Sequence, residues 1–158
     1  MRAENPAESG TLNFVTHEGP PPDFGAAVFE REIPSDPALV PPLLVRVVEF
    51  LREESLVKPE EENKVGLCLE EALQNAVLHG NEGVFDKKVR LAIFKRDPEM
   101  LFVVSDEGRG FDRLAVKSPV SPERIWEESG RGLFLICHYM DRAEFYEGGR
   151  VLVMARFF

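Results

Sequence analysis

The stretch Glu71-Ala72-Leu73-Gln74-Asn75-Ala76-Val77-Leu78-His79-Gly80-Asn81 decides how the rest of the chain is interpreted. Its apolar residues continue a helical stripe that begins at Val65, and the proline and carboxylates of residues 58–62 mark the start of that helix. Glu71 and Asn75 are four residues apart, so they share one face of the predicted helix. A carboxylate and an amide placed together can supply a general base and an oxygen ligand for Mg²⁺. Taken alone, the pair also fits a solvated helix face.

Patterns elsewhere in the chain predict strands on both sides of this helix. Alternating or continuously apolar runs indicate strands at residues 26–33, 88–94, 100–105, 143–146 and 151–157, with a further short strand at 11–16. A turn at residues 97–99 and the pair Gly148-Gly149 each join two of these runs into an antiparallel hairpin. A first helix is expected to start near Pro41, after an irregular turn, and a last helix at Gly132.

The order strand, helix, helix, hairpin, long loop, helix, hairpin predicts an α+β fold. We expect a two-layer sandwich in which a mostly antiparallel, mixed sheet carries its helices on one face. The run Pro20-Pro21-Pro22 separates an N-terminal tail, residues 1–24, from a single domain, residues 25–158. Residues 106–130 show little periodicity, and a loop of that length inside a compact domain is typical of a functional or a disordered segment.

Composition argues against several classes of protein. The 158 residues include 19 Lys and Arg against 28 Asp and Glu, a formal net charge of −9, which disfavours general binding to nucleic acid or to an anionic membrane. No apolar run is long enough to span a bilayer, and the first residues lack the apolar stretch of a signal peptide. Cys68 and Cys137 belong to no metal-binding cluster and fall in apolar helical patterns. Core thiols of this kind fit a reducing cytosol, so we expect a cytoplasmic protein.

Two further segments can carry chemistry. In Asp106-Glu107-Gly108-Arg109-Gly110, a carboxylate at the end of an apolar strand can accept a hydrogen bond from an exocyclic amine such as that of adenine, and the glycines let a ligand approach the backbone. Ser129-Gly130-Arg131-Gly132-Leu133 opens the last helix, and a helix N-terminus attracts phosphate. Taken alone, these segments also fit an ordinary turn and a helix cap. The chain contains neither a Walker A loop nor a dinucleotide-binding GxGxxG pattern.

The order of these three motifs resembles the nucleotide site of the GHKL ATPases, the superfamily of gyrase, the ninety-kilodalton heat-shock chaperones, histidine kinases and mismatch-repair ATPases. In finer detail, EALQNAVLHGN (71–81), SDEGRGFD (105–112) and GRGLFLICHYMD (130–141) are similar to the small anti-sigma factor serine/threonine kinases. The resemblance runs from Phe29 to the C-terminus. It implies a Bergerat-type ATP-binding fold, with ATP and Mg²⁺ as cofactors.

The resemblance also assigns roles to individual residues of the first two motifs. Glu71 would be the catalytic base that acts on an attacking hydroxyl, and Asn75 would ligate the Mg²⁺ that bridges the ATP phosphates. Asp106 would accept a hydrogen bond from the adenine amino group. Gly108 and Gly110 would let the base and ribose pack against their loop.

In the third motif, Gly130, Arg131, Gly132 and Leu133 would close over the phosphates through their backbone N–H groups, and residues 113–129 would form a lid over ATP. Glu70 is one residue out of frame, and His79 is expected to end the helix or to pack beside the lid. By the same resemblance the protein would bind a sigma factor and phosphorylate an anti-sigma factor antagonist. It would act as a homodimer, without direct contact to nucleic acid or membrane.

Two departures from the family pattern leave other functions open. Gly148-Gly149-Arg150 stands where members often carry Gly-Thr, and Glu127-Glu128 stands where some carry an arginine. The candidates for positive charge near the phosphates are Arg109, Arg131 and Arg124. One alternative is a nucleotide-dependent binding switch without transferase activity. Another is the ATPase domain of a histidine kinase whose acceptor histidine lies on a different chain.

Overall fold

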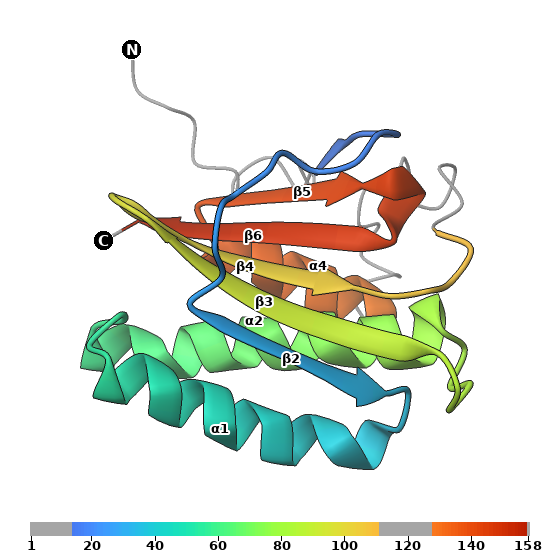
Figure 1. Ribbon diagram of the computed structural model, residues 1–158, viewed down its shortest axis with the longest axis horizontal. Helices are drawn as coiled ribbons and strands as arrows, with labels where there is room; N and C mark the ends of the chain where they lie inside the picture. Colours follow the sequence, from blue (N-terminus) through green and yellow to red (C-terminus); the bar gives the residue numbers. More distant parts are fainter. Residues whose placement is uncertain (1–13, 111–127, 158) are drawn as a thin grey trace.

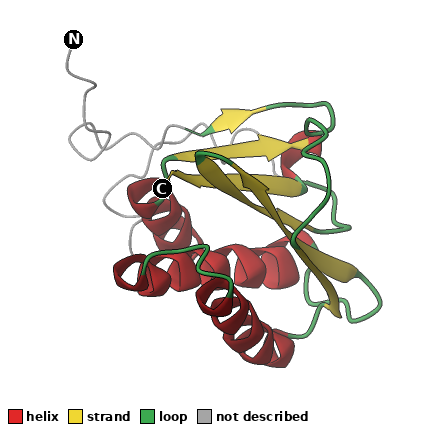
Figure 2. Cartoon of the chain, turned by 60° about the vertical axis from the view of Figure 1, so that its left-hand side comes forward, coloured by secondary structure: helices red, strands yellow, loops and turns green. Residues whose placement is uncertain are grey.

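A computed structural model describes residues 14–110 and 128–157 of the chain. These residues form one six-stranded sheet of order β1-β5-β6-β4-β3-β2, with three α-helices packed against one face (Figure 1; Figure 2). Every strand pairing is antiparallel except that of β1 with β5. The prediction of a two-layer α+β sandwich with a mostly antiparallel, mixed sheet and helices on one face is therefore confirmed.

The strands largely follow the predicted runs. They are β1 (Val15–Thr16), β2 (Phe29–Pro34), β3 (Lys88–Arg96), β4 (Glu99–Ser105), β5 (Arg142–Tyr146) and β6 (Val151–Phe157). Both predicted hairpins form, β3 with β4 and β5 with β6. The second strand was expected from Ala26 but starts at Phe29. The N–H of Val28 donates to Ile93, the residue that Phe29 also pairs with, so the regular register begins only at Phe29.

The helices are α1 (Val40–Glu53), α2 (Glu62–Asn75) and α4 (Glu128–Tyr139). A short 3₁₀ turn, Pro37–Leu39, precedes α1 and is capped by Asp36, whose Oδ1 accepts the N–H of Ala38 at 2.9 Å. The expected irregular turn before the first helix is thus confirmed. A second 3₁₀ turn, Pro59–Glu61, likewise leads into α2.

The expected start of the last helix at Gly132 is wrong, because α4 already begins at Glu128. Glycines have poor helix propensity, which is why the pattern placed them before the helix. In the folded chain the buried Gly132 lies against the side chain of Glu71 of α2, which would have to shift to admit a Cβ at this position. Packing between α2 and α4 therefore overrides local propensity and extends the helix through the glycines.

The main core lies between the helices and the sheet. Every residue of the predicted α2 stripe is buried: Val65, Cys68, Leu69, Ala72, Leu73, Ala76 and Val77. From the sheet, alternate residues of β3, β4 and β6 point into the same core, among them Leu91, Phe102 and Met154. This packing fixes the end of α2 relative to the ends of β4 and β6, where the three sequence motifs meet.

The opposite face of the sheet is also apolar and has a second, smaller core. Phe24 and Ala27 pack there against buried residues that include Phe94 and Leu101. In Figure 1 the described N-terminal segment crosses this face from β1 to β2. Part of the segment that the sequence assigns to a tail therefore covers the sheet. Among the helices of the described residues, none has the length and apolar character that crossing a membrane requires.

Candidate functional site

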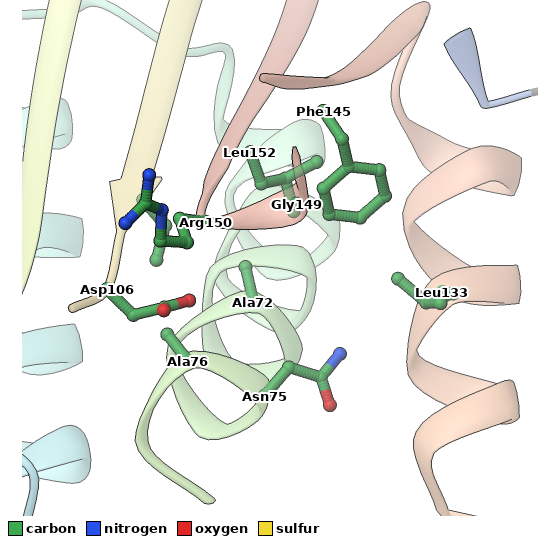
Figure 3. A pocket seen from close by; sticks show the side chains of 10 residues that line it. Ala72, Asn75, Ala76, Asp106, Leu133, Phe145, Gly149, Arg150 and Leu152 are labelled. Atoms are coloured by element: carbon green, nitrogen blue, oxygen red, sulfur yellow. The ribbon is translucent and has the colours of Figure 1, made fainter. Parts of the chain in front are cut away.

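A pocket lies where the C-terminal end of α2 meets the end of β4 and the start of β6 (Figure 3). Its walls are mostly apolar: Ala72, Ala76, Val104, Leu133, Phe145 and Leu152. Its polar lining residues are Asn75, Asp106 and Arg150, with Gly149 beside them. Figure 3 shows Asn75 on α2, Asp106 at the end of β4 and Leu133 on α4 around the same space. An apolar slot with a few polar groups is the usual form of a small-molecule site.

The last turns of α2 place the two residues of the first motif. Asn75 lines the pocket, and Glu71 lies one turn earlier on the same helix face. A Cβ added to Gly132 would stand 2.5 Å from Oε2 of Glu71, so the carboxylate lies directly against the backbone of α4. Leu133, the next residue of α4, lines the pocket. Glu71 therefore adjoins the pocket at its α4 side, as the shared helix face predicted.

Beyond Asn75 the helix widens into a π-helical turn, Ala76–Gly80. The N–H of Asn81 donates to the carbonyl of Ala76, five residues earlier, at 2.8 Å. Such widened turns are rare and often occur at functional sites. Here the turn carries Gly80 against the carboxylate of Asp106, and any Cβ on Gly80 would overlap Oδ2 and Cγ of that side chain. Gly80 thus ends the π-helical turn and also contacts the side chain of Asp106.

Asp106 is the first residue after β4, and a short loop holds its carboxylate. Its Oδ1 accepts the backbone N–H of Gly108 at 2.8 Å. Gly108 is buried against the carbonyl of Gly80, with no room for a Cβ. Burial raises the pKa of Asp106, while the Gly108 N–H and the nearby charges of Arg150 and Lys87 partly oppose that rise. The other oxygen, Oδ2, lies close to Gly80.

The last glycine of the loop, Gly110, has a φ of +85°, a conformation that side chains rarely adopt. A Cβ there would also overlap the carbonyl of Gly148 in the β5–β6 turn. The same turn brings Gly149 and Arg150 to the pocket. Gly108 and Gly110 therefore let the loop pack closely against two other backbone segments, at Gly80 and at Gly148.

Asn81 is the last residue of the first motif, but the sequence assigns it no role. Its side chain is fully buried, and all its polar groups are used. Its Nδ2 donates to Ser35 Oγ at 2.7 Å and to the carbonyl of Lys88 at 2.9 Å, while its Oδ1 accepts the N–H of Glu107 at 2.8 Å. The amide thus ties the loop that carries Asp106 to the start of β3 and to the segment before α1.

A family model described as the histidine kinase-like ATPase domain matches residues 33–156, which include all three motifs and the pocket. The chain belongs to this family. A search of curated proteins found no match to the chain. Membership in this family supports binding of ATP by the domain.

The ATPase fold brings most of the predicted site residues together. Asn75, Asp106 and Leu133 line the pocket, Glu71 adjoins it, and Gly108 and Gly110 hold the loop of Asp106. Gly130 lies in the first turn of α4, where backbone N–H groups lack partners within the helix. Arg131 is exposed on the same helix. Residues 113–127 of the predicted lid, Arg124 among them, lie outside the described residues.

The donor set of this ATPase domain fits ATP with Mg²⁺. The close contacts at Gly80, Gly108 and Gly110 leave Asp106 beside an apolar slot of the kind that a purine base fills. In the described part of the chain, no three His, Cys, Asp or Glu side chains cluster as a complete metal site. A metal held by the amide oxygen of Asn75 and by phosphate oxygens needs no such cluster, because Mg²⁺ commonly binds through one protein ligand and a substrate.

Sequence reasoning missed several residues of the site. The motifs assign no role to Gly80 or Asn81, and they mark Arg150 only as a departure from the Gly-Thr of the family pattern. Phe145 and Leu152 read as ordinary strand residues, yet both line the pocket. The sequence did hold a signal for Asn81. It is a polar residue that directly follows an apolar helical stripe, and a polar side chain buried in such a place needs hydrogen-bond partners.

Proposed function

We propose that this ATPase domain binds ATP with Mg²⁺ and transfers the γ-phosphoryl group to a serine or threonine of a partner protein. The observation that carries the proposal is the placement of Glu71 and Asn75. They share one face of α2 at the pocket, with the carboxylate of Glu71 against α4 and the amide of Asn75 in the pocket wall. A base and a metal ligand one helical turn apart are the groups that phosphoryl transfer to a hydroxyl requires.

In the proposed reaction, Glu71 accepts the proton of the attacking hydroxyl as that oxygen bonds to the γ-phosphorus. The bond between the γ-phosphorus and its bridging oxygen breaks, and ADP leaves. Asp106 orients the base, and Asn75 with the N-terminal turn of α4 receives the phosphates. Asn75 would hold Mg²⁺, which would neutralise the negative charge on the phosphate oxygens.

The partners follow from the resemblance of the motifs to small anti-sigma factor kinases. On that basis the protein binds a sigma factor and phosphorylates an anti-sigma factor antagonist, acting in the cytoplasm as a homodimer. The net charge of −9 supports control of transcription through protein contacts and not through DNA.

Incubation with γ-labelled ATP, Mg²⁺ and a candidate antagonist tests the proposal. Glu71→Gln should lower transfer by about a hundredfold or more while ATP still binds, since a general base contributes about 10²–10⁴ to a rate. Glu70→Gln is the matched control: Glu70 accepts from Gln74 at 3.4 Å and lies one residue out of frame. Its transfer rate should equal that of the wild type.

Three other outcomes would contradict the proposal. Equal transfer by wild type and Glu71→Gln would remove the base role. ATP binding without any transfer would favour a nucleotide-dependent binding switch. Acid-labile label on a partner would identify phosphohistidine and favour the ATPase domain of a histidine kinase.

A further inference from the structure

Arg150 lies directly across the sheet from Asp106. The last regular pair of β4 and β6 is Ser105 with Val151, and the N–H of Asp106 donates to the carbonyl of Arg150 at 2.9 Å. Asp106 and Arg150 therefore continue the ladder by one more pair. Side chains of directly opposed residues in an antiparallel pair stand on the same face, with Cβ atoms about 5 Å apart.

The neighbouring strand residues show on which face of the sheet the Asp106 side chain lies. Val104 of β4 and Leu152 of β6 point into the main core beneath the helices. Because side chains alternate along a strand, Asp106 points to that same side, where α2 ends. Arg150 precedes β6 and has helical backbone angles, φ −75° and ψ −19°, so its direction does not follow this alternation. Both residues line the pocket, and Figure 3 shows them side by side at its edge. Arg150 is exposed, and in Figure 3 its guanidinium lies at the edge of the pocket, turned away from Asn75 and Leu133.

The pair presents unlike hydrogen-bonding groups next to each other. Ionised Asp106 only accepts, and Arg150 only donates. Oδ1 of Asp106 is occupied by the N–H of Gly108, and Oδ2 faces Gly80. The hydrogen bond recorded for the guanidinium is a long one, from Nε to the carbonyl of Glu147 at 3.4 Å. Its NH₂ groups are therefore able to turn toward a ligand that Asp106 holds.

We propose that Arg150 reads the edge of the purine base together with Asp106. Adenine carries an amino donor at position 6 beside an acceptor nitrogen, N1. When the 6-amino group donates to Asp106, N1 lies on the side of Arg150. A guanidinium N–H of Arg150 then donates a hydrogen bond to N1. Arg150 is then a specificity-determining residue of the ATP site, a role that rests on the proposed function.

The position of Arg150 favours the base and not the phosphates. Arg150 sits on the Asp106 side of the pocket, whereas Asn75 and the N-terminal turns of α4 lie across from it (Figure 3). The phosphates are drawn to the helix N-terminus and to Asn75. An arginine on the far side from those groups meets the other end of the nucleotide.

Isothermal calorimetry with ATP and with 1-deaza-ATP, in which C–H replaces N1, tests the role. Wild type should bind ATP about tenfold more tightly than 1-deaza-ATP, as expected for one hydrogen bond with a charged donor. Arg150→Met should bind both nucleotides about as weakly as the wild type binds 1-deaza-ATP, so that the preference for ATP falls to about twofold or less. Arg46→Met, an exposed arginine on α1, is the matched control and should keep the wild-type preference.

The melting temperatures of the variants should equal that of the wild type, since the substituted side chains are exposed. A tenfold preference that persists in Arg150→Met would overturn the inference while leaving ATP binding intact. Tighter binding of GTP than ATP by the wild type would also overturn it, because guanine presents donor and acceptor in the opposite order. If the wild type bound neither ATP nor 1-deaza-ATP, the proposed function itself would fail, and this inference with it.

Discussion

Gly80 lies directly against the carboxylate of Asp106, so that the end of α2 and the end of β4 meet at a position where no side chain fits. Gly108 returns the contact by lying against the carbonyl of Gly80. In the sequence, the β3–β4 hairpin separates Gly80 from Asp106. The geometry of the pocket thus depends on a backbone-to-backbone contact between distant segments.

Gly80→Ala is expected to weaken ATP binding by about tenfold or more and to lower the free energy of unfolding by about 1–3 kcal/mol. The added methyl overlaps Oδ2 and Cγ of Asp106, so either the carboxylate or the widened turn must move. Calorimetry with ATP and urea denaturation measure the two effects.

Gly66→Ala is the matched control on the same helix. A Cβ at Gly66 would stand 3.6 Å from Cγ2 of Val48, an ordinary contact, so the change should stabilise the fold by about 0.5–1 kcal/mol and leave ATP affinity unchanged. An ATP affinity in Gly80→Ala equal to that of Gly66→Ala would show that the Gly80 contact does not position Asp106.

Asn81→Ala should destabilise the domain by about 1–3 kcal/mol, because it removes the hydrogen bonds of a buried amide to Ser35 Oγ, the carbonyl of Lys88 and the N–H of Glu107. The loss of the Glu107 contact also loosens the loop of Asp106, so the affinity for ATP should fall as well. The exposed Asn63 on α2 gives the control, since Asn63→Ala should change stability by less than about 0.5 kcal/mol. Equal unfolding midpoints for the two variants would contradict the structural role of Asn81.

The secondary structure was predictable because its signals are local. The seven-residue stripe of α2 has the period of a helix and is buried in full, and both hairpins form where turn residues separate apolar runs. The family motifs located Asn75, Asp106 and Leu133, and all three reach one pocket.

What the sequence could not show depends on contacts between distant segments. Gly132 has poor helix propensity, yet it lies inside α4 because Glu71 packs on it. Arg150 reaches the edge of the pocket because it lies opposite Asp106, and register between β4 and β6 is not encoded in either strand alone. Such residues become visible only when the sheet is assembled.

Asn75→Ala is expected to abolish the contribution of Mg²⁺ to nucleotide binding while the fold survives. Asn75 is half-buried at the end of α2, and its amide oxygen is the proposed metal ligand in the pocket wall. In the wild type, added Mg²⁺ should strengthen binding of ATP, whereas in the variant the affinity should be the same with Mg²⁺ and with EDTA. A metal dependence that persists in the variant, measured by calorimetry, would rule out this ligand.

Both cysteines should resist thiol reagents until the domain unfolds. Burial raises the pKa of Cys68 to about 12 and that of Cys137 to about 12, so neither forms the reactive thiolate near neutral pH. Titration with a chromogenic disulfide at pH 8 should give slow modification of the native protein and two rapid equivalents in denaturant. Fast modification of native protein would contradict the burial of these side chains.

The pKa of Asp106, raised by burial, predicts opposite pH dependences for binding and for stability. The ionised carboxylate is the better acceptor, so ATP affinity should fall as the pH is lowered through the raised pKa, above the ordinary aspartate value of 3.8. In the folded state the proton binds more tightly than in the unfolded chain. Asp106 therefore contributes stability that is complete below the unfolded pKa and is lost as the pH rises through the folded one.

Asp106→Asn removes both effects. Its amide oxygen can still accept the N–H of Gly108, so at neutral pH the variant should unfold at a higher denaturant concentration than the wild type. It should bind ATP at least about tenfold more weakly, with no acid-dependent loss beyond that of the nucleotide itself. Calorimetry and urea denaturation between pH 4 and 8 measure both curves, and wild-type affinity in the variant would remove Asp106 from base recognition.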